Sequence, residues 1–103
     1  MGGKSRGPLT ESMFYIIMSL MHRERCGTEI NAFVDQKTSG RVILGPGTLY
    51  TLLSKFQDEK LIAETQVEGR KRTYRITDKG RAVYLDELNR LKNCVRDGEE
   101  ALR

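Results

Sequence analysis

The chain has 103 residues, enough for one domain but not two, and its core is too small to enclose a large buried active site. Its 18 lysines and arginines exceed its 14 acidic residues by four. Because this excess is moderate, the distribution of the charge says more about possible binding partners than the net charge does. No stretch approaches the roughly 20 apolar residues of a membrane span, and the start lacks a secretory signal. We therefore expect a cytoplasmic protein without membrane contact.

Residue types that serve catalysis and metal binding are sparse. Cys26 and Cys94 lie far apart in the sequence, without a CxxC or a Cys/His pattern, so free thiols are expected rather than a disulfide or a metal site. His22 is the one histidine of the sequence, beside Arg23 and Glu24, and no nucleophile motif is present. We expect neither an enzyme nor a bound cofactor.

The first eight residues, MGGKSRGP, are polar and rich in glycine. Segments of this kind at a chain end are poorly ordered unless something ties them down, so a flexible arm is expected. Lys4 and Arg6 are the cations that such an arm could bring to a polyanion.

Residues 9–23 predict a first helix that is apolar on more than one side. Thr10 is a suitable N-cap, because its hydroxyl can accept a hydrogen bond from a free N–H of the first turn. A helix with so much apolar surface needs more than one partner. We expect it to be shared between the core and a subunit interface, with Met13 and Ile17 at the interface.

The next segment predicts a second helix and a short strand. Thr28 follows a glycine and is expected to cap the helix. The apolar residues expected to face inward are Ile30, Phe33 and Val34. After the helix-breaking sequence KTSGR, the run RVIL at 41–44 is rich in β-branched residues and has the length of one small strand.

LGPGTLYTLL, residues 44–53, predicts a third helix with an unusual polar face. Pro46 suits the first helical position and Gly45 the N-cap. The apolar residues Leu49, Leu52, Leu53 and Phe56 recur at helical spacing and form a buried stripe. The other side has short hydroxyls where long charged residues would be usual, and it can lie close against a polar surface. A solvated helix face is the alternative.

A hairpin with a basic tip is expected after this helix. Residues 61–76 alternate in polarity on either side of a turn at Glu68-Gly69-Arg70. The tip and returning strand contain four cations and no acid, namely Arg70, Lys71, Arg72 and Arg75. Contact with phosphates is favoured over the alternative, a charged edge that only prevents aggregation.

Thr77 is expected to cap a final helix over 78–103. A narrow apolar stripe follows with coiled-coil spacing, made by Tyr84, Leu88, Leu91, Val95 and Leu102. The helix could pack on its own domain, but a narrow stripe among charged residues favours a partner helix. We expect this stripe, together with Met13 and Ile17, to form a homodimer interface.

The element order predicts a mainly α protein with a small β-hairpin, a winged helix-turn-helix followed by a C-terminal dimerisation helix. In that fold the third helix enters the major groove and the hairpin reaches the flanking backbone. The expected organisation is an arm over 1–8, a DNA-binding domain over 9–77 and a dimerisation helix over 78–103.

The same segments resemble the PadR-like family of transcriptional regulators. The resemblance lies in GTEI at 27–30, PGTLYTLL at 46–53, LIAE at 61–64 and KRTYRITDKG at 71–80. It implies a repressor that dimerises through its first and last helices and responds to small aromatic or cationic compounds. The single terminal helix is similar to that of the compact subgroup. The chain departs from the family at Thr28 and Thr73, and it has no tryptophan to stack on an effector.

This interpretation assigns DNA contacts to residues on the polar side of the third helix and to the wing. The expected contact residues are Gly47, Thr48, Tyr50, Thr51, Ser54, Lys55, Arg70, Lys71, Arg72 and Arg75. Short hydroxyls contact base edges, whereas the cations contact phosphates. The predicted function is a sequence-specific repressor that binds a palindromic operator in double-stranded DNA as a homodimer. Release by a small hydrophobic or aromatic effector, bound beside Met13, Ile17 and Leu91, is a further expectation. The alternative is a winged-helix module that contacts proteins and not DNA.

Overall fold

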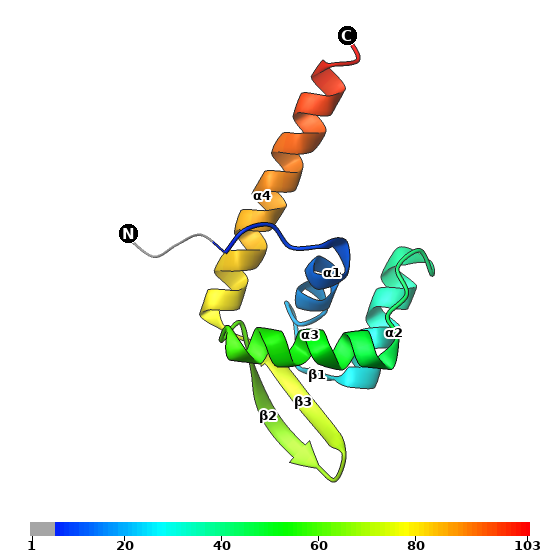
Figure 1. Cartoon of the computed structure of the whole chain (residues 1–103), viewed down its shortest axis with the longest axis vertical. Coiled ribbons are helices and arrows are strands. Elements are labelled where there is room, and N and C mark those ends of the chain that lie inside the picture. The colour runs from blue at the N-terminus through cyan, green and yellow to red at the C-terminus, as the bar shows by residue number, and fades with distance from the viewer. Residues whose placement is uncertain (1–5) are drawn as a thin grey trace.

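Four helices and a three-stranded antiparallel sheet make up the protein, which a computed structural model describes over residues 6–103 (Figure 1). The elements in chain order are α1 (Glu11–Ser19), β1 (Arg25–Cys26), α2 (Gly27–Thr38), α3 (Pro46–Asp58), β2 (Ile62–Glu68), β3 (Lys71–Ile76) and α4 (Asp78–Glu100). The strands are arranged in the order β1-β3-β2. This is the predicted winged helix-turn-helix, but the third strand is Arg25–Cys26 and not the predicted segment 41–44.

Three of the four helix starts follow the expected local chemistry. The Thr10 hydroxyl accepts a hydrogen bond from the N–H of Met13, at 3.2 Å. The Thr77 hydroxyl accepts one from the N–H of Gly80, at 3.0 Å. Pro46 is the first residue of α3 and extended Gly45 precedes it. Each of these signals acts within a few residues, so the sequence alone is sufficient to place these starts.

The prediction for the end of α1 and the start of α2 is wrong. α1 ends at Ser19, not near residue 23, because the chain turns away after Leu20 and forms β1 against β3. The N-cap of α2 is Cys26, whose N–H donates to the Glu29 carboxylate at 2.8 Å. Thr28 therefore lies inside the first turn, where it is exposed.

The strand predicted at 41–44 does not form. This segment is a loop, and the N–H of Val42 donates to the Thr38 hydroxyl, at 3.1 Å, where a strand would need a backbone carbonyl of a neighbour. Val42 and Leu44 are buried in the core, whereas Ile43 between them is 83% exposed. The free edge of β3 is occupied by Arg25–Cys26, so the apolar alternation serves packing and not strand pairing.

The core lies between α1, α2, α3 and the base of the hairpin. Ile17, Ile30 and Phe56 have no exposed surface, and Tyr74 of β3 joins the same cluster. Because Tyr74 is buried, it packs the wing onto the domain. The N–H of Leu61 donates to the carbonyl of Phe56, which fixes the hairpin directly at the end of α3.

α4 begins in the domain and then extends away from it (Figure 1). Its 23 residues span about 35 Å at 1.5 Å per residue. The Glu87 carboxylate accepts hydrogen bonds from the N–H of Leu9 and from Arg90, and this is the last buried residue of the helix. Beyond Leu91 every residue of α4 is exposed.

Part of the predicted flexible arm is held in place. Lys4 lies outside the described residues. Arg6, however, makes two hydrogen bonds to the Glu59 carboxylate just after α3, and its guanidinium lies 6.0 Å from the centre of the Phe56 ring. The Arg6 guanidinium holds the pKa of Glu59 below its usual value. Arg6 therefore fastens the chain start to α3, and its charge is paired.

Candidate nucleic-acid interface

α3 has one apolar face and one polar face, and the two are cleanly separated. Leu49, Leu53 and Phe56 are buried. The predicted contact residues of this helix are all exposed, namely Gly47, Thr48, Tyr50, Thr51, Ser54 and Lys55. Thr48, Thr51 and Lys55 follow helical spacing and therefore share one face. The helix has no acidic residue before Asp58, so this face carries no charge that would repel a phosphate.

The side chain of Tyr50 is fixed by contact with the start of α2. A Cβ at Gly27 would lie 2.5 Å from the Tyr50 hydroxyl oxygen and 3.0 Å from its Cζ. Glycine is therefore the residue that lets Tyr50 lie over the α2 N-terminus while 47% of the tyrosine stays exposed. The sequence presented Gly27 only as part of a motif, and this contact between the two helices was not foreseen.

The wing is less strongly basic than the sequence suggested. Arg72 pairs with Glu64 across the hairpin at 2.7 Å, and the pKa of Arg72 is raised by this carboxylate. Lys71 lies directly opposite Glu68 in the strand register. The prediction of a basic hairpin considered only the charges of the tip and the returning strand and left out the acids of β2. The acids of β2 become neighbours of these cations because the turn at Gly69 pairs the two strands.

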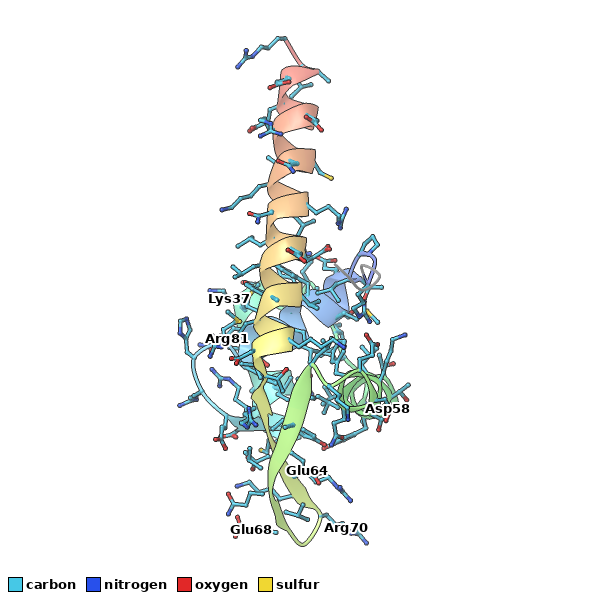
Figure 2. The ribbon with its side chains drawn as sticks, turned by 90° about the vertical axis from the view of Figure 1, so that its left-hand side faces the viewer. Lys37, Asp58, Glu64, Glu68, Arg70 and Arg81 are labelled. Atoms are coloured by element: carbon cyan, nitrogen blue, oxygen red, sulfur yellow. The ribbon has the colours of Figure 1, made fainter. Side chains whose placement is uncertain are left out.

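Three wing cations, Arg70, Lys71 and Arg75, form no ion pair among residues 6–103, although Lys71 lies opposite Glu68 in the register. Arg70 lies at the tip of the hairpin, at the opposite end of the molecule from the C-terminal end of α4 (Figure 2). Arg75 is exposed and donates to the carbonyl of Ile76 at 3.3 Å. Figure 1 shows the hairpin extending below α3, with its base at one end of that helix. The polar face of α3 and the wing can therefore lie along one continuous partner.

The apolar residues expected at a dimer interface fall into three groups. Val95 on the free half of α4 is 59% exposed, and Leu102 is 88% exposed. Leu102 lies beyond the helix, because α4 ends at Glu100 and not at the predicted residue 103. Met13, Tyr84, Leu88 and Leu91 are partly exposed, and the Tyr84 ring stacks on Phe14 of α1 at 4.9 Å between centroids. Ile17 has no exposed surface, so it cannot contact a partner subunit and belongs to the core.

A hollow of about 290 Å³ lies between α1 and α4, on the side where an effector was expected. Leu91 is among its lining residues, but Met13 and Ile17 are not. Its lining is of mixed charge, because Glu11, Glu87 and Arg90 accompany the apolar residues. The expected grouping of Met13, Ile17 and Leu91 around one apolar hollow is therefore absent from the described protomer.

Within residues 6–103 no group of three or more histidine, cysteine or acidic side chains could hold a metal ion. Cys26 is buried and Cys94 is exposed, and both are free thiols. No described helix is both long enough and apolar enough to span a bilayer. The arrangement presents a polar helix face beside a charged hairpin, which suits binding to an extended partner.

Solved structures of similar fold include several regulators. A transcriptional regulator from Clostridium thermocellum is 22% identical, with a TM-score of 0.78 over 89% of this chain and 90% of that one. A PadR family transcription regulator from Clostridium difficile is 20% identical, with a TM-score of 0.72 over 91% and 100%. Bacillus subtilis PadR in complex with operator DNA is 24% identical, with a TM-score of 0.65 over 74% of this chain and 45% of that one. These likenesses show the fold.

No curated protein matches the chain in sequence. The model of the transcriptional regulator PadR-like family matches residues 16–86, which is well over half of the chain. The matched region runs from α1 through the first turns of α4 and so includes α3 and the wing. The chain belongs to the PadR-like family of transcriptional regulators.

Proposed function

We propose that the protein is a sequence-specific repressor that binds a near-palindromic operator as a homodimer and is released by a small effector. The observation that carries the proposal is the exposed face of α3, which is made of short hydroxyls, one tyrosine and one lysine and contains no acid before Asp58. Short hydroxyls contact base edges and thymine methyl groups when a helix lies deep in the major groove. Thr48, Thr51 and Ser54 are the residues we assign to base edges.

The remaining contact residues are assigned to the DNA backbone. Gly47 has open space where a side chain would be, so a phosphate can approach the start of α3 closely. Tyr50 and Lys55 flank the hydroxyls, and the exposed wing cations Arg70 and Arg75 extend the contact to the neighbouring backbone. Arg72 and Lys71 take part with weaker net charge, because Glu64 and Glu68 lie beside them.

The free half of α4 supports the homodimer. A helical segment as short as this free half is only marginally stable in water when nothing packs on it. Most helices gain stability by packing an apolar face. Leu91 and Val95 are four residues apart and lie on one side of the helix, and both Val95 and Leu102, two residues beyond the helix end, are exposed. A second copy of the same stripe would bury them. Two protomers related by a two-fold axis place their α3 helices on half-sites about 34–36 Å apart, which predicts a near-palindrome.

Selection of bound duplexes from a random pool tests the function and yields the operator. Thr51→Ala is expected to relax the preference for the selected sequence by roughly 1–3 kcal/mol if the hydroxyl contacts a base edge, and to leave the salt dependence of binding unchanged. A pool that returns no enriched sequence, together with no salt-dependent affinity for any duplex, contradicts the proposal and favours a protein-contact module.

A further inference from the structure

The ladder between β2 and β3 has one irregular step, about halfway along the hairpin. Glu64 lies opposite Tyr74. The next pair of the ladder joins Gln66 to Thr73, so Thr65 has no partner residue on β3. An extra residue of this kind is a β-bulge, which bends its strand and increases the local twist. The direction of the hairpin beyond this step therefore depends on the geometry at Thr65.

Beyond the bulge the hairpin projects from the domain. β1 pairs with Tyr74 and Thr73 of β3 and ends there. Every residue from 65 to 72 is exposed, and Figure 1 shows this part of the hairpin extending away from the helices. The ion pair of Arg72 with Glu64 joins the two strands to each other and not to the domain. Two strands by themselves are only marginally stable in water, so the position of Arg70 at the tip depends on how the hairpin is held at the bulge.

The side chain of Thr65 ties the bulge to the connection between α1 and β1. Its hydroxyl donates a hydrogen bond to the Glu24 carboxylate, with 2.7 Å between the two oxygens. The carbonyl oxygen of Thr73 lies 3.4 Å from the same hydroxyl, so Glu24 is the closer acceptor. A hydrogen bond to an ionised carboxylate is stronger than one between neutral groups. The residue of β2 that the ladder leaves out is thus joined by its side chain to a segment outside the hairpin.

The segment that contains Glu24 is itself held on both sides. Before Glu24, the Arg81 side chain of α4 donates to the carbonyl of Met21 at 3.1 Å. After it, the Arg25 side chain donates to the carbonyl of Ser19 at 2.6 Å, and Arg25 also belongs to β1. Contacts to α1, to α4 and to the sheet therefore fix the position of the Glu24 backbone, so its carboxylate is a firm attachment point for the bulge.

We propose that Thr65 and Glu24 are positioning residues of the wing, and that their hydrogen bond sets the direction of the hairpin relative to α3 and so places Arg70 on the DNA backbone. Both residues act through Arg70 and not by contacting DNA themselves. The inference rests on the proposed function for the DNA contact of Arg70. The direction of the hairpin, in contrast, is a property of the protein without DNA, so the two parts can be tested separately.

Residual dipolar couplings of the backbone amides, measured by NMR on the whole chain without DNA, test the direction of the hairpin. Thr65 and Glu24 are exposed, so substitutions there are compatible with the folded domain. Thr65→Val keeps the branched shape of the side chain but removes the hydroxyl, whereas Thr65→Ser keeps the hydroxyl. The couplings of residues 66–72 are expected to change relative to those of α3 in Thr65→Val and in Glu24→Ala, and to keep their wild-type values in Thr65→Ser. Unchanged couplings in Thr65→Val overturn the proposal, and so do equal changes in Thr65→Val and Thr65→Ser.

Binding to a fluorescein-labelled duplex of random sequence at low salt tests the consequence for Arg70, because a phosphate contact does not depend on the base sequence. Thr65→Val is expected to bind about fivefold more weakly than the wild-type chain, and Thr65→Ser to bind equally well. Adding Thr65→Val to Arg70→Ala should weaken binding little further, because the contact is already absent. Additive losses overturn the proposal. A wild-type chain that binds no duplex contradicts the proposed function alone, and the couplings then decide whether the hydrogen bond directs the wing.

Discussion

The hydroxyl of Tyr50 on α3 occupies the space that any side chain at position 27, the first residue of α2, would need. A Cβ there would lie 2.5 Å from the hydroxyl oxygen, well inside van der Waals contact. The pair therefore couples the start of one helix to the orientation of an exposed tyrosine on the next. Because Tyr50 is also a proposed backbone contact, this packing bears directly on DNA binding.

The sign of the change in the free energy of unfolding caused by Gly27→Ala should reveal this coupling. In an unobstructed helix alanine stabilises by roughly 0.5–1 kcal/mol relative to glycine. Here overpacking should reverse the sign and destabilise by about 1–3 kcal/mol, and it should weaken operator binding as Tyr50 moves. Adding Tyr50→Phe removes the closest atom and should restore part of the lost stability. A stabilised Gly27→Ala protein in urea unfolding contradicts the contact.

Gly80 in the first turn of α4 should tolerate no side chain. A Cβ there would overlap the carbonyl oxygen of Leu61 and lie 2.9 Å from the Ile76 side chain, so backbone would have to move. We expect Gly80→Ala to lower the free energy of unfolding by about 3 kcal/mol. Gly98→Ala, in the same helix but with open space around it, should be neutral or stabilising in the same urea measurement. Similar stabilities of the two variants would show that α4 does not pack closely on Leu61 and Ile76.

Glu64 should limit the contribution of Arg72 to DNA binding. Glu64→Gln removes the charge that pairs with Arg72, so affinity for operator and random duplex alike should rise at low salt. The slope of log affinity against log salt should steepen by up to about 0.9 per protomer. Glu99→Gln makes the same change in net charge at the far end of α4 and should have little effect. If the double variant with Arg72→Ala keeps the gain, another cation is responsible.

A charge introduced into the exposed part of the apolar stripe on α4 should prevent dimer formation. Val95 is 59% exposed in the protomer, so Val95→Asp is compatible with the folded domain but places a charge in the proposed interface. We expect monomers in light scattering and much weaker operator binding, because each protomer brings one α3. Asn93→Asp adds the same charge on the opposite face of the helix and should remain dimeric. A dimeric Val95→Asp protein would move the interface elsewhere.

Glu87 should make stability depend on pH in the acid range. Hydrogen bonds from Arg90, and then from the Leu9 N–H, hold the pKa of this carboxyl below its ordinary value of 4.5. A lowered pKa in the folded state contributes stability above the ordinary value, and this contribution is lost as the pH falls through the folded-state pKa. Urea unfolding should therefore separate the wild-type chain from Glu87→Gln at pH 7. The difference should shrink below about pH 4.5, and a difference independent of pH contradicts the assignment.

The sequence by itself determined the features that depend on neighbouring residues. Thr10 and Thr77 each cap a helix through an N–H three residues later, and Pro46 sets its own backbone angle, so these starts follow from local chemistry. The division of α3 into a buried stripe and a hydroxyl face follows from helical periodicity alone. Together with the alternating pattern of the hairpin at 61–76, these features were sufficient to predict the fold class and the helix proposed to contact DNA.

Only the tertiary structure decided the relationships between distant residues. RVIL had the composition of a strand, but Arg25–Cys26 occupies the edge of β3, and pairing depends on which segment reaches that edge. The charge of Arg72 depends on Glu64, eight residues earlier, once the hairpin closes. The sequence pattern places Ile17 at the interface, but Ile17 lies in the core. The apolar pattern of a helix does not say which element covers each side. Gly27 could be interpreted only when Tyr50 lay against it, since the space around a glycine is a property of the packed chain.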